Sequence, residues 1–379
     1  MPYWRLSGFY FFYFTSLGAL LPYWSLYLKS LGLSVADIGN LMAVLMATKI
    51  VSPNVWGWVA DHTGRRMGIV RLGCLISMLA FAGVLAGDSF TWLLVVLVVF
   101  SFFWNATLPQ FEATTFSHLG DQVHRYSSIR LWGSIGFIVA VWSLGRVLEG
   151  DGISMLPMIL LVLFAGIWLS SLIVPEEAAG HLSLDHEPLR RLLSRPEVVG
   201  LLLVCFLMQA SHGPYYTFYS IYLRSYGYSL SAIGSLWALS VAAEVGIFLL
   251  MPRLVPLVGL RRLLLSSFLL AALRWLIIAL YPQSLVLIIF AQCLHAASFG
   301  IYHAATIQYI HGFFTGRHQG KGQALYSSVS FGAGGALGSF YSGYLFEGLG
   351  ARSMFLVAML LALSGFLIAW RYLPRVSFR

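Results

Sequence analysis

The sequence predicts an all-α polytopic membrane protein, with twelve transmembrane helices arranged as two six-helix bundles around a central cavity. Three observations support this fold class. Hydrophobic residues make up 59% of the 379 residues and charged residues only 10%, whereas soluble domains carry about 25% charged residues. Twelve apolar segments approach the roughly 20 residues that a helix needs to cross a bilayer. One stretch of the first half recurs in the second half.

The expected spans form two groups of six. They cover residues 4–28, 36–60, 67–87, 90–116, 127–148 and 153–174, and then 198–223, 230–252, 261–281, 284–310, 321–346 and 350–373. Among the connections, only the polar residues 175–197 are long enough to be an inter-domain linker. We therefore expect an N-terminal bundle over residues 1–174, a cytoplasmic linker over 175–197 and a C-terminal bundle over 198–379.

Lysine and arginine collect on one side of this topology, which is typical of the cytoplasmic side of a membrane protein. Of the 23 basic residues, 16 fall on that side, together with both chain termini. Membrane orientation thereby explains the formal net charge of +9, and we expect no nucleic-acid partner. The pattern predicts a multi-pass protein of the cell inner (cytoplasmic) membrane, surrounded by the lipid bilayer, with both termini in the cytoplasm.

An internal repeat supports the division into two bundles. Residues 25–44 and 220–239 are identical at ten of twenty positions without a gap, at an offset of 195. A weaker repeat at an offset of 198 pairs Gly136, Gly145, Glu149 and Gly150 with Gly334, Gly343, Glu347 and Gly348. Transporters built from such repeats bind their substrate near the bilayer midplane, at the interface of the repeats.

Two charged residues stand at the ends of consecutive spans. Glu112 closes one apolar run and Arg130 opens the next, so a helical hairpin would bring both charges to a similar depth. A charge inside a bilayer costs about 2.5–3.5 kcal/mol by insertion scales and usually marks a functional site. We interpret the pair as part of a substrate site. The alternative is an ion pair that only orients two helices.

The repeat also aligns Lys49 with Glu244, two residues of opposite charge in the middle of equivalent spans. We expect both in the central cavity. The alternative for Lys49 is a side chain that snorkels to the membrane surface. Arg274 and His295 lie within two further spans of the second half and are candidates for the same cavity.

The histidines and cysteines do not form a metal-binding pattern. His295, His303 and His311 are spaced by eight residues, which turns the side chains by about 80° on an α-helix. The three cysteines lie inside apolar runs without metal-ligand spacing. We expect no metal and no other cofactor.

A loop motif follows the second expected span. Its residues are Gly57, Asp61, Gly64, Arg65 and Arg66. The stretch resembles the loop motif G-x-x-x-D-R-x-G-R-R of the major facilitator superfamily, with His62 in place of the usual basic residue. The resemblance implies a cytoplasmic gate rather than a substrate contact. The equivalent stretch of the second half has Pro256 in place of the acid, so the gate is expected to be asymmetric.

Nearly the whole chain resembles the 3-phenylpropionic acid permease group of that superfamily, which is related to lactose permease and the nucleoside–proton symporters. The segments that carry the resemblance are Leu21–Lys29, Arg130–Phe137, Ala243–Val245, Arg274–Trp275, Leu294–His295 and Tyr326–Val329. In lactose permease, a P-x-x-E acid and an arginine of an R-x-x-G-x-x-G segment grip the substrate. Pro109–Glu112 and Arg130–Gly136 match these two elements with the same spacing.

The resemblance further implies that Glu244, Arg274 and His295 take part in proton coupling. Ser298 stands where lactose permease has its coupling acid. Another group must then carry the proton, and the resemblance leaves Glu244, Glu112 and His295 as candidates, since histidine titrates near neutral pH.

The charges expected in the cavity suggest an anionic substrate. The three basic residues Lys49, Arg130 and Arg274 exceed the two acids by one charge, which a single carboxylate would balance. Aromatic residues make up 15% of the chain and suit a substrate with a ring. We therefore expect proton symport of a small organic solute such as 3-phenylpropionate, by alternating access.

Other functions remain open at this stage. The Glu112–Arg130 pair equally suits a sugar or a nucleoside, and a transporter-fold sensor or lipid translocator is a further alternative. The sequence has neither an H-E-x-x-H motif nor a P-loop, so we expect no enzyme. The partners we expect are a small-molecule substrate and protons, and we expect a monomer.

Overall fold

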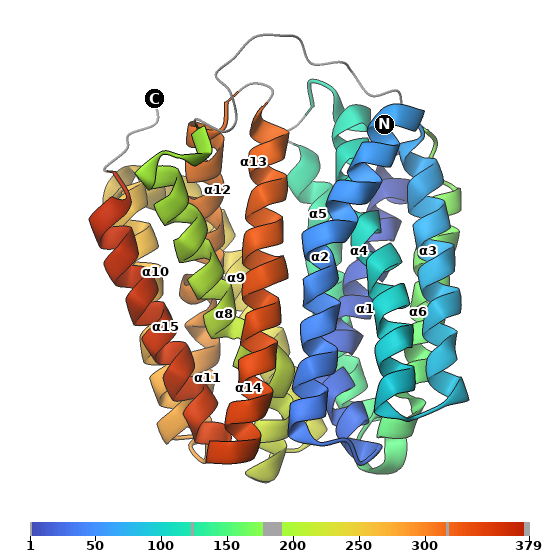
Figure 1. Ribbon diagram of the computed structural model, residues 1–379, viewed down its shortest axis with the longest axis vertical. Coiled ribbons are helices and arrows are strands. Elements are labelled where there is room, and N and C mark those ends of the chain that lie inside the picture. The colour runs from blue at the N-terminus through green and yellow to red at the C-terminus, as the bar shows by residue number, and fades with distance from the viewer. Residues whose placement is uncertain (1, 123–124, 177–191, 316–317, 375–379) are drawn as a thin grey trace. The chain divides into compact units, whose positions relative to one another are not determined.

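The structure, a computed structural model, describes residues 2–122, 125–176, 192–315 and 318–374. Within these ranges the chain is helical and contains no strand, which confirms the predicted all-α fold class (Figure 1). The chain divides into two compact units, Met1–His181 with Gly227–Ala238, and Leu182–Tyr226 with Leu239–Arg379. Most of the predicted linker, residues 177–191, lies outside the described residues.

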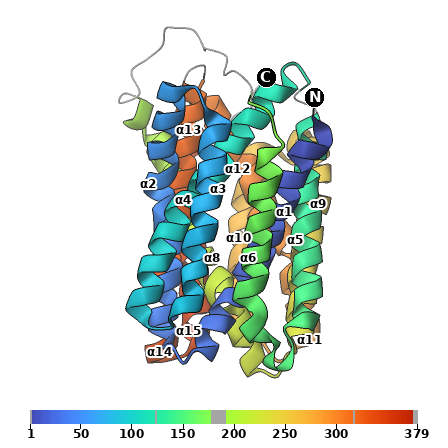
Figure 2. The same cartoon turned by 90° about the vertical axis from the view of Figure 1, so that its right-hand side faces the viewer.

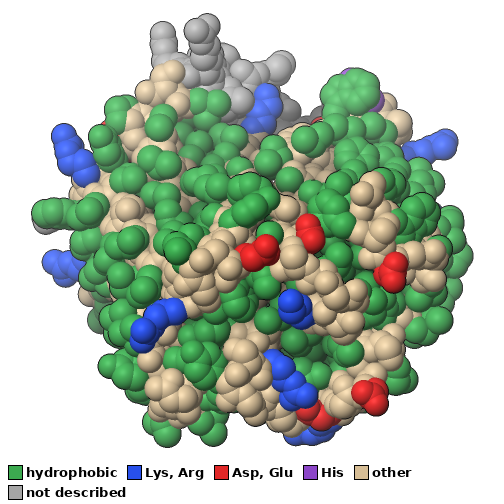
Figure 3. All heavy atoms as spheres, turned by 60° about the horizontal axis from the view of Figure 1, so that its bottom comes forward, with side chains coloured by type: hydrophobic (Ala, Val, Ile, Leu, Met, Phe, Trp, Pro, Cys, Tyr) green, Lys and Arg blue, Asp and Glu red, His purple; other side chains and the backbone are tan. Residues whose placement is uncertain are grey.

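Ten of the described helical segments are long and apolar enough to cross a membrane. The other two expected spans, 4–28 and 321–346, are also helical. These two spans are less apolar than the other ten, because the first is rich in tyrosine and serine and the second in glycine and serine. Figure 3 shows hydrophobic side chains over much of the outer surface, with acidic and basic side chains gathered at the helix ends that face the viewer.

The N-terminal unit consists mainly of six long helices that run up and down. Its helices are α1 (Tyr3–Ser30), α2 (Val35–Thr63), α3 (Arg66–Ala82) with the 3-10 turn η1 (Gly83–Ala86), α4 (Phe90–Leu119), α5 (Tyr126–Val147), and α6 (Leu156–Leu172) after η3 (Gly150–Met155). The α1 helix packs against α5 and α6, whereas α4 packs against α2 and α3 (Figure 2).

The C-terminal unit repeats this plan. Its helices are α8 (Pro196–Ser225), α9 (Leu230–Val258), α10 (Leu260–Leu280), α11 (Leu285–Cys293), η4 (Ala296–Ile301), α12 (Tyr302–Phe313), α13 (His318–Ser327), η5 (Ser328–Gly334), α14 (Gly335–Leu349) and α15 (Ala351–Tyr372). The α8 helix packs against α14 and α15, and α10 packs against α15.

Glycines at equivalent positions let helices cross closely in both units. A β-carbon added to Gly136 on α5 would lie 2.5 Å from the carbonyl oxygen of Phe11 on α1. A β-carbon added to Gly334, at the end of η5, would lie 2.5 Å from the carbonyl oxygen of Phe206 on α8. Phe11 and Phe206 are related by the offset of 195, and Gly136 and Gly334 by the offset of 198. The same close contact therefore forms in both units, which confirms the predicted 6+6 repeat.

The turns before α2 and α9 repeat as well. Gly32 and Gly227 have φ angles of 86° and 84°, a left-handed conformation that glycine adopts without a steric penalty. Two residues later, Ser34 accepts a hydrogen bond from the backbone N–H of Asp37, and Ser229 accepts one from Ala232. Serine is a preferred N-cap residue, so the repeated sequence produces the same helix start twice.

The first turns of α9 group with the N-terminal unit, although the sequence predicts the bundle boundary before residue 198. A β-carbon added to Gly145 on α5 would lie 2.6 Å from the carbonyl oxygen of Leu230. Glu149 accepts a hydrogen bond of 3.2 Å from the backbone N–H of Ser231. These contacts explain why residues 227–238 belong to the first unit.

Candidate functional site

Glu112 is half-buried on α4 and is held by an aromatic pair. Its carboxylate accepts a hydrogen bond of 3.2 Å from the hydroxyl of Tyr126 on α5. The Tyr126 ring packs edge-on against Tyr10 of α1, with 6.4 Å between ring centroids. The acid predicted from the sequence thus has a fixed position between three helices.

Arg130 lies on α5, and its guanidinium carbon stands 3.7 Å from the ring centroid of Phe14 and 5.7 Å from that of Tyr10. Between the described residues we find neither a hydrogen bond nor an ion pair from Arg130 to Glu112. The two side chains instead contact neighbouring aromatic rings, because Tyr10 faces the guanidinium and Tyr126 holds the carboxylate. An arginine that stacks on rings keeps its hydrogen-bond donors for another acceptor.

Lys49 is half-buried on α2, next to a polar contact between α2 and α4. The side-chain amide of Asn105 donates to the hydroxyl of Thr48 at 2.8 Å and to the carbonyl of Leu45 at 3.1 Å. The ammonium group of Lys49 itself makes no hydrogen bond or ion pair with any residue in the described ranges. A membrane-embedded cation without a protein partner is a candidate ligand for an anion.

In the C-terminal unit, three predicted site residues are in direct contact. Arg274 on α10 is fully buried, and its Nη1 lies 2.9 Å from Nδ1 of His295, which is 4% exposed. Nε2 of the same imidazole lies 3.4 Å from a carboxylate oxygen of Glu244 on α9. Because a guanidinium only donates hydrogen bonds, Nδ1 accepts and the imidazole proton of neutral His295 resides on Nε2, facing the acid.

Aromatic and polar side chains surround this cluster. The guanidinium of Arg274 lies 4.1 Å from the ring centroid of Tyr215 and 4.6 Å from that of Trp275. The Tyr215 hydroxyl donates to the side-chain oxygen of Gln292 at 2.9 Å, and the Gln292 amide donates to Tyr219. The cluster therefore combines a guanidinium that stacks on aromatic rings with a neighbouring chain of hydrogen-bonded side chains.

Ser298 also contacts the cluster. Its hydroxyl oxygen lies 3.4 Å from Nη1 of Arg274. Ser298 is thus a neutral partner of the same arginine. Glu244 is the carboxylate in direct contact with His295.

A π-helical segment changes the expected spacing of the histidines. The segment η4 follows His295, and its wider turn brings His295, Phe299 and His303 into one stack. The ring centroids are 5.3 Å and 5.8 Å apart, with interplanar angles of 6° and 2°. The rotation of about 80° predicted for His295 and His303 assumed a regular α-helix, and the π turn departs from that geometry. Such π turns occur frequently at functional sites.

Sequence reasoning did not single out some residues of these clusters. Tyr126 precedes Arg130 by four positions, a spacing that places both on one helix face. Gln292 and Phe299 flank His295 on the same span, and an intramembrane glutamine is a recognisable signal. Phe14 had no signal of its own, because phenylalanine is common in membrane spans.

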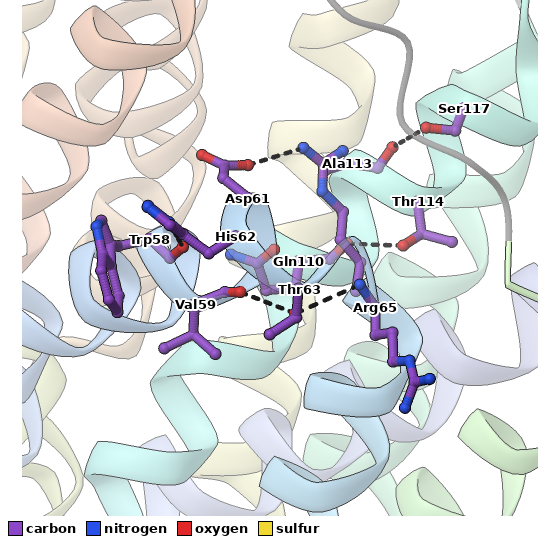
Figure 4. Close-up of polar contacts among 11 residues, drawn as sticks. Trp58, Val59, Asp61, His62, Thr63, Arg65, Gln110, Ala113, Thr114 and Ser117 are labelled. Carbon is purple, nitrogen blue, oxygen red and sulfur yellow. Dashed lines mark hydrogen bonds and ion pairs between the residues drawn. The ribbon is translucent and has the colours of Figure 1, made fainter.

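The loop motif ends α2 and begins α3 (Figure 4). The carboxylate of Asp61 lies 3.3 Å from Nη2 of Arg66. Gly64 ends α2 in the left-handed region, with φ at 66°. A β-carbon added to Gly57 would make only an ordinary contact of 3.6 Å with the side-chain nitrogen of Gln110 on α4, so packing there does not require glycine. Arg65 points away from Asp61 in Figure 4, so the two arginines of the motif have different surroundings.

Two repeated helical units, apolar spans, and an acid–imidazole–guanidinium contact within those spans define a multi-pass membrane transporter. The model of the MFS_1 like family matches residues 3–357, and this chain belongs to that family. The family prediction from the sequence is thereby confirmed.

Curated relatives match almost the whole chain. The probable 3-phenylpropionic acid transporter of Escherichia coli (strain K12) is 30% identical over 380 residues, covering 98% of both chains. The maltose permease of Geobacillus stearothermophilus is 27% identical, covering 95% of this chain and 92% of the permease. These relatives are named as transporters rather than as enzymes.

Solved transporter structures share the fold. A point mutant of the nucleoside transporter NupG aligns with a TM-score of 0.88 at 17% identity, over 98% of this chain and 100% of that chain. A bacterial homologue of the human lysosomal transporter Spinster aligns with a TM-score of 0.77 at 16% identity, over 100% of this chain and 98% of that chain. At these identities the likeness concerns the fold alone.

Proposed function

We propose that this chain is a secondary active transporter of the inner membrane that couples protons to the symport of a small aromatic carboxylate, similar to 3-phenylpropionate. The observation that carries the proposal is the direct contact of Arg274, His295 and Glu244 within the spans of the C-terminal unit. The relative named as a probable 3-phenylpropionic acid transporter supports the substrate class.

Charge balance within the cluster links the proton to the substrate. With Glu244 ionised, its negative charge offsets the positive charge of Arg274. When Glu244 takes up a proton, the cluster keeps the net positive charge of the guanidinium, and charges interact strongly away from water. A carboxylate substrate restores neutrality, so proton and anion bind together. His295 transmits the change because its two nitrogens contact the acid and the arginine.

In the N-terminal unit we assign substrate binding to Arg130, Lys49 and Glu112. Arg130 stacks on Phe14 and keeps its donors, which suits a carboxylate attached to a ring. The ammonium of Lys49 adds a second positive charge. Glu112, held by Tyr126, can accept a hydrogen bond from a hydroxyl group on the ring of an aromatic carboxylate; 3-phenylpropionate itself has no such donor.

The loop motif is assigned to the cytoplasmic gate. Gly64 ends α2 in a left-handed conformation, Asp61 pairs with Arg66, and Gly57 is included from the motif resemblance. Arg65 is included in the gate from the motif resemblance. We further propose that both termini are cytoplasmic and that the transporter acts as a monomer by alternating access.

A sugar or nucleoside symporter is the second candidate function. The hydrogen-bonded carboxylate of Glu112 is an acceptor that suits hydroxyl groups. One relative is named as a maltose permease and one structural neighbour as a nucleoside transporter. Competition with unlabelled maltose and uridine in the experiment below separates this candidate from the first.

The test is uptake of labelled 3-phenylpropionate into proteoliposomes, with and without an inward proton gradient. Wild type is compared with Glu244→Gln, Glu112→Gln and Arg130→Ala. The matched control is Glu347→Gln, the same change at an exposed acid near the end of α14. We expect gradient-driven accumulation in wild type and control, exchange without accumulation in Glu244→Gln, and no uptake in Arg130→Ala.

Contrary results are equally specific. Full accumulation by Glu244→Gln would remove this acid from proton coupling. Uptake that survives both Glu112→Gln and Arg130→Ala would show that these side chains do not bind the substrate and serve only helix packing. Uptake of maltose or uridine in place of 3-phenylpropionate would favour the second candidate.

A further inference from the structure

A groove of about 210 Å³ lies between α2 and α3 on the N-terminal unit. Its lining residues are Trp56, Val59, Thr63, Arg65, Gly68, Ile69 and Leu72. The walls are apolar, and the polar side chains of Thr63 and Arg65 stand where α2 ends and α3 begins. Trp56 and Thr63 are seven residues apart on α2, so the groove follows the helix for about 10 Å at 1.5 Å per residue.

Glycine keeps the floor of this groove open. Gly68 is exposed, and a β-carbon added there would contact only the β-carbon of Arg65, at 3.5 Å. A larger side chain at Gly68 would therefore extend into the groove without striking the backbone. The opposite wall includes Leu72, which is 46% exposed.

Three arginines lie close together in sequence at this point, and their surroundings differ. Arg66 pairs with Asp61, and Arg71 donates to the backbone carbonyls of Ser171 and Val174. The guanidinium of Arg65 forms no hydrogen bond or ion pair with the other residues that the structure describes. Arg65 is exposed and points away from Asp61 (Figure 4).

We propose that this groove binds one anionic glycerophospholipid, with its headgroup phosphate on Arg65 and one acyl chain along Val59, Ile69 and Leu72. A cationic end and an apolar remainder match the amphipathic structure of such a lipid. Membrane-facing arginine contributes about a fivefold gain in affinity for an anionic lipid. Lipid binding in this groove is separate from substrate binding, and the lipid phosphate is the proposed ligand of Arg65.

The experiment titrates phosphatidylglycerol against the delipidated full-length protein in detergent and counts bound lipid by native mass spectrometry. Phosphatidylethanolamine with the same acyl chains tests the headgroup. Arg65→Gln removes the charge, and Arg262→Gln makes the same change at an exposed arginine on α10. Gly68→Leu fills the groove and keeps the charge, with Gly68→Ala as its smaller control.

We expect wild type to bind phosphatidylglycerol more tightly than phosphatidylethanolamine. Arg65→Gln should lower the phosphatidylglycerol affinity about fivefold, and Arg262→Gln should not change it. The phosphatidylethanolamine affinity should fall less, because the ammonium group of that lipid already offsets its phosphate charge. Gly68→Leu should lose both lipids, whereas Gly68→Ala should keep them. Equal affinities of Arg65→Gln and Arg262→Gln for phosphatidylglycerol, or equal affinities of wild type for the two headgroups, would overturn the proposal. If Gly68→Leu does not fold, the arginine variants and the headgroup comparison decide.

Discussion

Both units carry charged side chains within their helices but connect them differently. In the C-terminal unit, Arg274 and Glu244 each contact His295, at Nδ1 and Nε2 of its ring. In the N-terminal unit, Glu112 and Arg130 are each held by aromatic rings instead. The helices of the two halves therefore correspond, whereas the contacts of their charged side chains do not. A connected cluster suits an internal proton equilibrium, whereas separated charges suit an external ligand.

A second pair of equivalent helix crossings differs between the units. A β-carbon added to Gly18 on α1 would lie 2.8 Å from the carbonyl oxygen of Phe137 and 3.0 Å from the β-carbon of Ala140 on α5. At the equivalent crossing, Gly213 on α8 meets the backbone of Gly338 on α14. The second unit therefore has glycine on both helices where the first has glycine facing alanine.

The largest difference between the units is expected on removal of the buried arginine. Arg274→Leu leaves Nδ1 of the buried His295 without its donor, which costs about 1–3 kcal/mol, and it also removes a cation stacked on Tyr215 and Trp275. Arg130→Leu removes a cation stacked on rings, which costs about 0.5–2 kcal/mol. Thermal unfolding of both variants in detergent measures the contrast. Equal losses of stability would show that the C-terminal cluster is not held together by charge.

The glycine crossings provide an intermediate effect. Gly213→Ala forces two backbones apart, and overpacking of this kind costs about 1–3 kcal/mol. Gly18→Ala meets an oxygen and a methyl group at somewhat longer distances, so its unfolding free energy should fall less. The check is the unfolding midpoint of each variant, with Gly8→Ala as a control because an added β-carbon there meets no atom within 4 Å. A larger loss for Gly18→Ala would contradict the comparison.

The smallest effect on stability is expected at Lys49, the repeat partner of Glu244. Lys49→Met removes a cation that makes no hydrogen bond or ion pair within the described ranges, so stability should stay within about 0.5 kcal/mol of wild type. Glu244→Gln removes the acid that contacts His295 and should lower stability more. Substrate uptake is measured alongside, and Lys49→Met should raise KM without abolishing proton-driven accumulation. A loss of proton coupling in Lys49→Met would indicate that Lys49 and Glu244 both take part in proton coupling.

Much of the architecture followed from the sequence alone, because it depends on local patterns. Apolar runs of sufficient length predict the spans, and the repeat at an offset of 195 predicts the two units. The charged residues inside spans were recognisable because they are rare there. The direct contact of Arg274 with His295 matches the group of residues that the family resemblance had implied.

The tertiary structure decided which of these side chains meet. Contacts between helices depend on crossing and rotation, which a linear pattern does not contain. The tyrosine between Glu112 and α1, the π turn that stacks His295 on Phe299, and the packing of residues 227–238 on α5 all arise this way. The groove beside Arg65 exists for the same reason, since it lies between two helices whose separation the sequence does not specify.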